Sequence, residues 1–387
     1  MEIAVVLLLL VLVLGGQVLL FSKYLFRNFR YRCSFDRQEV FEGEQIQMVE
    51  TVLNGKALPI PYLRADIVTS RFLEFADTES SLTDETRFVP SFFMLKGYQK
   101  ITRRWKVTCA RRGELRVRSI SLVSSDLLGL RTLSQSFPGS ARVLVLPTPA
   151  PLEGRFISPR MLQGEFSLRR TLLEDPFTVS GVREYQPSDP LNRVHWAATA
   201  KTGDIMVRHY DCTNRQNLTI ILNMQTGPNE RGLVNHPEQV EEGIKICAAL
   251  IQQAVAGSIP LRFATNASTQ QEERTLLITP EFSSQEGALE LLRVLARLQV
   301  RSTRHIVDLF QQLDQQAVSS DLVLVTAYMD EDISVFASRL SQQWGARLQV
   351  LVLDYDKGRD WGPELEVYYL RREETLVSSA VPEEGIA

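Results

Sequence analysis

The spacing of apolar residues divides the chain into regions with different periodicities. Residues 3–21 are apolar almost without interruption, which is about the length of one bilayer-spanning helix. Between residues 34 and 149, short runs alternate apolar and polar positions and are separated by turn signals such as Asn54-Gly55-Lys56. Such alternation predicts half-buried strands, and no stretch of this region keeps a helical period. We therefore predict an antiparallel β-sandwich of roughly seven strands.

The pattern changes after residue 217, where strands and helices alternate. A short, continuous apolar run at 218–222 predicts a buried parallel strand, and further strands are predicted at 261–265, 322–325, 348–353 and 365–370. Helical spacing lies between them, with Ser283 and Glu286 as a capping box for one helix and Asp332 as the cap of another. This order predicts a doubly wound sheet with helices on both faces. Ligands bind such sheets at the carboxyl ends of the strands, so the loops of interest are 223–227, 266–269, 326–329 and 354–357.

The charges beside the first apolar run indicate its orientation in a membrane. Glu2 precedes the run, and Lys23, Arg27, Arg30 and Arg32 follow it. A secretory signal carries its positive charge before the apolar run, which is the reverse order. We interpret the run as a transmembrane helix with the amino terminus outside and the chain from residue 23 onward in the cytoplasm. The alternatives are a cleaved signal peptide and a buried core helix.

Turn residues, charges and aromatic residues are combined most closely between residues 184 and 211. Asp189 is predicted to cap a helix that Pro190 opens and that ends near Gly203. Residues 205–210 then alternate as a strand would. The positions that give this stretch its character are Arg183, Tyr185, Pro187, Asp189, Arg193, Trp196, the run 199–203 and Val207. Together they resemble the signature of a bacterial family known as domain of unknown function 58.

Two interpretations of this signature stay open. Its candidate residues are Arg183, Tyr185, Asp189, Arg193, Trp196, Lys201 and Gly203. In the first, guanidinium groups pair with carboxylates around Trp196 and fix the segment to the following domain. In the second, the same arginine, tyrosine and tryptophan side chains form a recognition surface for a protein partner. A catalytic site built on His195 and Asp189 is a third possibility, which would make the protein a hydrolase.

The resemblance implies that the carboxyl-terminal domain is similar to a von Willebrand factor type A domain. That fold often holds a divalent cation through an Asp-x-Ser-x-Ser run after its first strand, because hard cations prefer oxygen ligands. Here the run reads Asn223-Met224-Gln225-Thr226-Gly227, and Thr326 follows another strand where an aspartate is often found. We therefore predict a degenerate metal-site loop comprising Asn223, Gln225, Thr226 and Thr326. No cofactor is expected, and Mg²⁺ is the alternative.

Composition and the remaining motifs narrow the function further. The formal net charge of -3 gives no sign of nucleic-acid binding. The four cysteines and four histidines are dispersed, with no metal-ligand spacing. The chain contains no GxSxG elbow, no phosphate-binding glycine-rich loop and no HExxH motif. We therefore expect that the protein is not an enzyme.

These observations predict a multi-domain α+β protein. Its expected parts are a transmembrane helix at 1–22, a β-sandwich domain at 23–150, a linker with the signature at 151–216, an α/β doubly wound, von Willebrand factor type A-like domain at 217–372 and a flexible tail at 373–387. We expect a membrane-anchored binding or scaffold protein that serves cell-envelope assembly. The resemblance implies two partners, a MoxR-type AAA+ ATPase and a transglutaminase-like membrane protein. A metal-dependent ligand-binding domain of the adhesion type is the alternative function.

Overall fold

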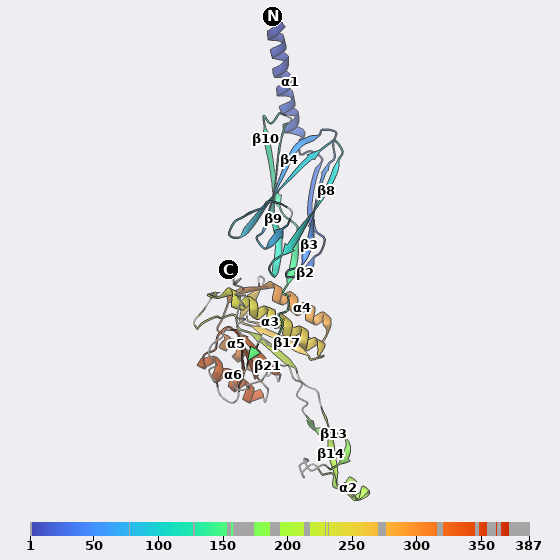
Figure 1. The fold of residues 1–387 in the computed structure, drawn as a ribbon, viewed down its shortest axis with the longest axis vertical. Coiled ribbons are helices and arrows are strands. Elements are labelled where there is room, and N and C mark those ends of the chain that lie inside the picture. The colour runs from blue at the N-terminus through green and yellow to red at the C-terminus, as the bar shows by residue number, and fades with distance from the viewer. Residues whose placement is uncertain are drawn as a thin grey trace, which may run out of the picture. The chain divides into compact units, whose positions relative to one another are not determined.

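The computed structural model describes residues 2–76, 78–126, 128–152, 156–157, 174–185, 194–212, 217–228, 230, 232–269, 276–315, 320–344, 348–353, 361 and 365–370. The chain forms two compact units (Figure 1). The first comprises residues 1–150 with 269–272 and 289–299, and the second comprises the remainder. The predicted flexible tail, 373–387, lies outside the described residues.

The first unit begins with helix α1 (Glu2–Tyr24). Its segment Val5–Tyr24 is long and apolar enough to cross a membrane, and it is the single such segment in the part of the chain that the structure describes. The side chains of residues 5–13 are exposed along the helix. Phe21 and Leu25, by contrast, are buried in the core of the sandwich that follows. The helix is therefore continuous with the folded domain at its carboxyl end.

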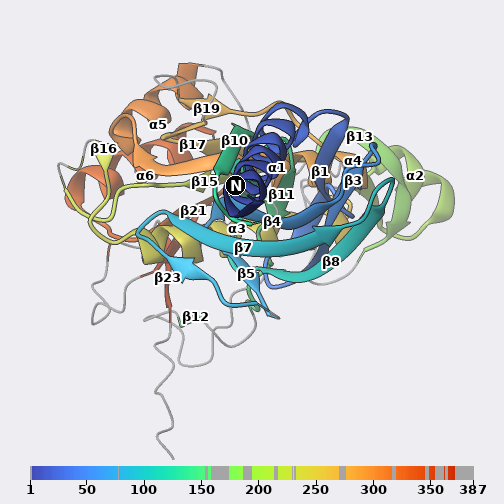
Figure 2. The ribbon, with the colours of Figure 1, turned by 90° about the horizontal axis from the view of Figure 1, so that it is seen from above.

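The rest of the first unit is a β-sandwich, seen end-on in Figure 2. One sheet has the order β1 (Phe29–Phe35), β3 (Gln45–Asn54), β8 (Lys100–Cys109) and β5 (Leu73–Phe75). The other has the order β2 (Glu39–Phe41), β11 (Arg142–Leu146), β9 (Gly113–Ser125), β4 (Ile60–Ser70), β7 (Thr86–Leu95) and β6 (Ser81–Leu82), with β10 (Thr132–Pro138) also paired to β9. The described strands outnumber the roughly seven predicted, and β11 pairs with β2 in parallel.

Alternation of apolar and polar residues builds this sandwich as expected. In β3, Ile46, Met48 and Val52 are buried, while the intervening positions are more exposed. Glu50 interrupts the series of apolar buried residues with a fully buried carboxylate. It accepts hydrogen bonds from Tyr31 Oη at 2.7 Å, Ser91 Oγ at 2.8 Å and Trp105 Nε1 at 3.1 Å. Three donors offset the cost of burying this charge.

The second unit is built on a seven-stranded sheet. Its order is β12 (Phe156–Ile157), β23 (Glu366–Leu370), β22 (Leu348–Val352), β21 (Asp321–Thr326), β15 (Leu218–Leu222), β17 (Leu261–Thr265) and β19 (Leu277–Ile278). The five strands from β23 to β17 are parallel, while β12 and β19 are antiparallel edge strands. Numbered along the chain, the parallel strands lie in the order 2-1-3-4-5, which is a doubly wound arrangement.

Helices cover both faces of this sheet. α5 (Ile306–Gln315) and α6 (Glu331–Trp344) pack on one face, around Ile221 and Leu324. α3 (Pro237–Ala256) packs on the other face, where Gly243 lies against the side chains of Leu222 and Val325. Both faces of the parallel strands are therefore buried, which explains why apolar residues predominate in their sequences and do not alternate with polar ones.

A small sheet, a strand pair and a short helix complete the unit. β16 (Gly232–Leu233), β20 (Leu298–Ser302) and β18 (Ala267–Thr269) form one small sheet. β13 (Glu174–Glu184) and β14 (Met206–Cys212) form an antiparallel pair, and α2 (Trp196–Thr202) lies between them in sequence. β13 falls in a stretch for which we predicted no strand.

Two helix caps differ from the predictions by one or two residues. α4 (Gln285–Arg297) is capped by Ser284, whose Oγ accepts a hydrogen bond from Gly287 N at 3.1 Å, and not by Ser283. The first turn of α6 is capped by Asp330, which accepts from Ile333 N at 2.8 Å, and not by Asp332. In each case two capping residues lie close together in sequence, and the position of the first helical turn selects between them.

Candidate functional site

The residues predicted as a degenerate metal-site loop gather at the carboxyl ends of three neighbouring strands. Asn223 and Gln225 follow β15, Thr326 ends β21, and Asn266 follows β17. All four are fully buried or nearly so. β15 and β21 are adjacent, and between them the strand order reverses direction. The cluster therefore occupies the switch point, where sheets of this kind bind ligands.

Three side-chain amides form the centre of this cluster. Asn266 Nδ2 donates to Asn223 Oδ1 at 3.1 Å and to the Arg304 carbonyl at 3.0 Å, while Asn266 Oδ1 accepts from Met224 N at 2.8 Å. Gln225 Oε1 accepts from Ile306 N at 3.0 Å. The amides therefore tie the loops after β15 and β17 to the start of α5.

Thr326 extends the network to β21. Asn223 Nδ2 donates to Thr326 Oγ1 at 3.1 Å, and Thr326 Oγ1 donates to the Tyr328 carbonyl at 2.6 Å. The Tyr328 hydroxyl is buried and has no hydrogen-bond partner among the described residues. Burial and the nearby Asp330 and Glu230 carboxylates raise the pKa of Tyr328, so the phenol stays neutral at physiological pH.

Glu230 supplies a carboxylate that the sequence analysis did not identify. Its side chain is buried and accepts hydrogen bonds from Thr226 N at 2.7 Å, from Thr226 Oγ1 at 2.8 Å and from Asn235 N at 3.2 Å. It follows Gly227 and Pro228, which signal only a turn in the sequence. The turn brings this carboxylate back onto Thr226, and no local motif predicts that contact.

The donor set does not suit a tightly bound divalent cation. Asn223 Oδ1, Gln225 Oε1 and Asn266 Oδ1 each accept hydrogen bonds from neighbouring N–H groups. Hard cations need several free oxygens in a nearly octahedral array, and amide nitrogens occupy that space here. Among the described residues, no group of three or more His, Cys, Asp or Glu side chains is arranged to hold a metal ion. The amide side chains hydrogen-bond to one another and hold together the loops that follow β15 and β17.

The signature segment forms a strand pair with a short helix. Val194 is buried and bridges Val207 on β14, and His195 N donates to the Met206 carbonyl at 2.7 Å. His195 is the N-cap of α2, because its Nδ1 accepts a hydrogen bond from Ala198 N at 3.1 Å. The predicted helix from Pro190 to near Gly203 is wrong at residues 194 and 195, because Val194 is paired with Val207 and α2 begins only at Trp196. The β-branched Val194 fills a buried position in a strand-like bridge instead. Residues 190–193 lie outside the described residues.

Two signature residues have clear structural roles. Thr199 Oγ1 donates to the His195 carbonyl at 3.1 Å and accepts from Met206 N at 3.0 Å, which joins α2 to β14. Gly203 ends the helix in the left-handed region with φ of 84°, and its N–H donates to the Thr199 carbonyl. This conformation is the usual helix stop for glycine, and the predicted helix end is confirmed.

The other signature residues divide into exposed and undescribed ones. Trp196 is 74% exposed on α2, Lys201 is exposed on the same helix, and Tyr185 is half-buried after β13. Asp189 and Arg193 lie outside the described residues, and Arg183 is described only as a backbone position of β13. The predicted ion-pair network around Trp196 therefore stays a prediction.

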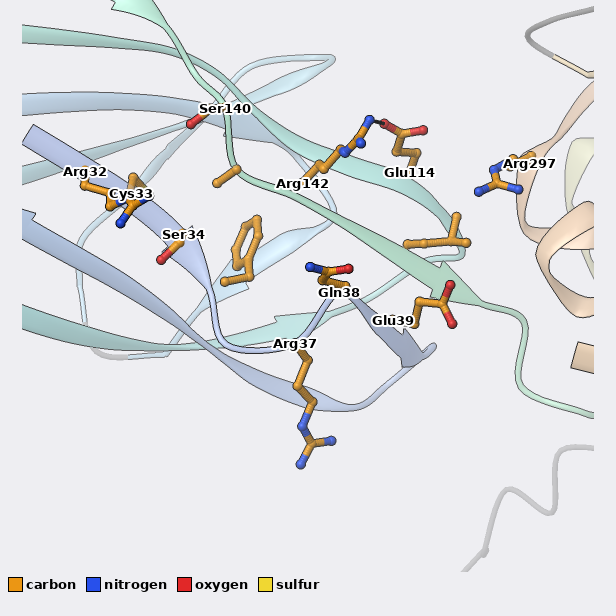
Figure 3. Close-up of a pocket in the computed structure, with 13 residues that line it drawn as sticks. Arg32, Cys33, Ser34, Arg37, Gln38, Glu39, Glu114, Ser140, Arg142 and Arg297 are labelled. Carbon is orange, nitrogen blue, oxygen red and sulfur yellow. Dashed lines mark ion pairs between the residues drawn. The ribbon is translucent and has the colours of Figure 1, made fainter. Parts of the chain in front are cut away.

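A separate cavity of about 610 Å³ opens in the first unit. Figure 3 shows its lining, in which Arg142 lies beside Glu114, while Arg37 points away from them. The Arg142–Glu114 ion pair spans 3.8 Å. Glu39 is paired with Arg293, with N–O distances of 2.8 and 2.9 Å. Charges of both signs line the cavity and are partly paired with each other, so its chemistry indicates no particular ligand.

Comparison with known proteins gives one family and several distant structures. Residues 181–360 match the family described as "Protein of unknown function DUF58". No curated protein matches the chain.

Solved structures resemble parts of the chain at low scores. A cohesin from Archaeoglobus fulgidus is 10% identical over 30% of this chain and 91% of its own, with a TM-score of 0.22. A cohesin module from a Clostridium perfringens family 33 glycoside hydrolase is 8% identical over 31% of this chain and 97% of its own, with a TM-score of 0.23. The sporulation control protein Spo0M from Bacillus subtilis is 16% identical over 30% of this chain and 49% of its own, with a TM-score of 0.20. At these scores, we infer neither fold nor function from them.

Proposed function

This chain belongs to the DUF58 family through residues 181–360, and from that premise we propose that it is a membrane-anchored binding protein without catalytic activity of its own. The observation that carries the proposal is the closed amide cluster of Asn223, Gln225 and Asn266. It fills the place where a doubly wound sheet would otherwise take a ligand. A protein whose ligand position is filled in this way binds through its surface.

The second unit is, in this proposal, a von Willebrand factor type A-like domain that has lost its cation. The loop after its first parallel strand carries Asn223, Gln225 and Gly227 in place of an acidic residue and two serines. The hydrogen bonds that a cation would replace are made by side-chain amides, with distances of 3.0–3.4 Å. Partner binding in this domain is therefore independent of Mg²⁺.

The surface that we assign to partner binding is the α2 surface, defined by Trp196 and Lys201. Trp196 is 74% exposed although tryptophan is costly to leave in water. Tryptophan is among the residues most enriched at binding hot spots, where its truncation costs 2 kcal/mol or more, which is about 30-fold in affinity. Thr199 and Gly203 hold α2 on β14 and so give this surface a fixed backbone.

The proposed partner is a MoxR-type AAA+ ATPase, with a transglutaminase-like membrane protein in the same assembly. Support for these partners comes from the family resemblance, since such proteins are implied beside members of this family. In this role the protein holds the ATPase at the membrane during cell-envelope assembly.

Binding of the purified ATPase to the full chain in nanodiscs tests the proposal. We expect association in at least one nucleotide state, weakened about 30-fold or more by Trp196→Ala. The matched control is Leu233→Ala, which truncates another exposed apolar side chain of the same unit, 80% exposed, and should change affinity less than about 3-fold. If the ATPase does not associate in any nucleotide state, the proposed partner is wrong. If binding is unchanged by Trp196→Ala, the assignment of the α2 surface to partner binding is wrong.

The proposal also fixes an orientation. Lys23, Arg27, Arg30 and Arg32 follow the apolar run of α1, and by the positive-inside rule these charges support a cytoplasmic location of the folded units. Protease added to inside-out membrane vesicles should therefore digest the second unit, whereas sealed right-side-out vesicles should protect it. Digestion of the second unit in the right-side-out vesicles would contradict the proposed orientation.

A further inference from the structure

The amino-terminal helix and the sandwich overlap along the helix axis. From Leu14 onward, one face of α1 is covered, with Gln17, Phe21 and Leu25 at helical spacing. Phe21 and Leu25 are 3% and 1% exposed. Gln17 Nε2 donates to Asp126 Oδ2 at 2.6 Å. Asp126 follows β9 directly, so the β9–β10 hairpin lies beside Gln17. Figure 1 shows the β10 end of the sandwich next to α1.

This overlap leaves α1 short of a bilayer's hydrocarbon thickness. The fourteen residues from Ile3 to Gly16 precede Gln17, the residue that hydrogen-bonds to the sandwich, and at 1.5 Å per residue they span about 21 Å. The hydrocarbon core is about 30 Å thick. If α1 crosses the bilayer, about 9 Å of that core must lie alongside the part of the helix that the sandwich covers. The hairpin beside Gln17 then lies within the hydrocarbon.

The hairpin tip has side chains suited to that position. Leu128 and Leu130 are 58% and 62% exposed, on either side of Gly129 in the turn. Asp126 is 3% exposed and also accepts from Arg131 N at 2.9 Å, so its carboxylate lies below the surface of the tip. The Arg131 side chain is exposed and is long enough to reach the lipid headgroups while the leucines enter the acyl chains.

We propose that the tip formed by Leu128, Gly129 and Leu130 inserts into the membrane that α1 spans. The partner is the acyl-chain region of a lipid bilayer, which covers the two exposed leucines and supplies the length that α1 lacks. Tip insertion fixes the tilt and height of the sandwich on the membrane, which a single helix alone does not determine. This inference rests on the proposed membrane anchor.

Spin labels on single cysteines measure the depth of the tip. Cys33, Cys109 and Cys247 are buried, and burial raises the pKa of Cys33 to about 12 and that of Cys109 to about 11, so these thiols resist labelling. Cys212 is first replaced by serine. The full chain then carries a label through Leu128→Cys, Val11→Cys or Leu82→Cys, in phosphatidylcholine liposomes.

Each label has a defined role. Val11, which is 62% exposed, reports whether α1 lies in the bilayer. Leu82 has the same 58% exposure as Leu128 and serves as the aqueous control. It lies on β6, which pairs with β7 at Phe88 and Arg87. Phe88 is seven residues, or about 23 Å, from Leu95 along β7. The Leu95 end of β7 lies near the carboxyl end of α1. Asn54 Nδ2 donates to the carbonyl of Lys96, next to Leu95, and Lys56 Nζ, two residues after Asn54, donates to the carbonyl of Leu25. Leu82 pairs near the opposite end of β7.

Collision rates with oxygen, which concentrates in lipid, and with a water-soluble nickel chelate decide the result. We expect the labels at 128 and 11 to collide more with oxygen and the label at 82 more with the chelate. A label at 128 that behaves like the label at 82, while position 11 is in lipid, overturns tip insertion alone. A label at 11 that is exposed to the chelate overturns the membrane anchor and tip insertion with it.

Discussion

At the scale of single residues, Asn266 is the most connected member of the amide cluster. Asn266→Ala leaves Met224 N without its acceptor in a buried site, whereas the Arg304 carbonyl keeps the Ser302 Oγ donor at 3.0 Å. A buried group left unpaired costs about 1–3 kcal/mol, so we expect a loss of about 1–3 kcal/mol in the free energy of unfolding of the α/β domain. Urea unfolding of the full chain in detergent, followed by tryptophan fluorescence, measures this loss.

Asn217→Ala is the matched control, because it removes the same side chain from a surface position. Asn217 Nδ2 donates to Glu281 Oε2 at 2.7 Å in an exposed hydrogen bond. Water replaces this partner in the variant, and the expected loss is below about 0.5 kcal/mol. Equal losses for the two variants would mean that the amide cluster adds no more than a surface hydrogen bond, and the domain would then have to be stabilised elsewhere.

At the scale of elements, the sequence predicts what depends on local pattern. β15 and β17 begin and end where the predicted strands do, at 218–222 and 261–265, because strands buried on both faces are rich in apolar residues and are bounded by polar or turn-forming ones. The start of α2 is missed for the opposite reason. Asp189 and Pro190 are local helix signals, whereas the extended state of Val194 depends on its pairing with Val207, thirteen residues away.

The candidate site divides in the same way. Asn223, Gln225 and Thr326 were found because strand ends can be located from the sequence, and parallel strands bring their carboxyl ends together. Their mutual hydrogen bonds, and the return of Glu230 onto Thr226, depend on loop conformation. Loop conformation is set by contacts between distant segments, and a hydrophobic pattern carries no information about it.

At the scale of the whole molecule, one helix is exposed along its amino-terminal part and buried in the sandwich at its carboxyl end. An apolar run has the same appearance whether lipid or protein covers it, so the sequence did not show that Phe21 and Leu25 belong to the sandwich core. Only the exposed part of α1, before Leu14, is free to contact lipid on all sides. The boundary between the exposed apolar segment and the folded domain therefore falls inside the helix.

Two truncations locate this boundary. Deletion of residues 2–16 should release the chain from membranes and leave the thermal melt of the sandwich nearly unchanged, because the buried end of α1 remains. Deletion of residues 2–25 also removes Phe21 and Leu25, and each such loss of a large buried side chain costs about 2–5 kcal/mol. We expect that variant to melt at a much lower temperature or to be degraded, as judged by limited proteolysis of residues 29–146. The shorter deletion combined with Phe21→Ala and Leu25→Ala should reproduce the defect. Identical melts for both deletions would show that the end of α1 is an anchor alone, with no part in the sandwich core.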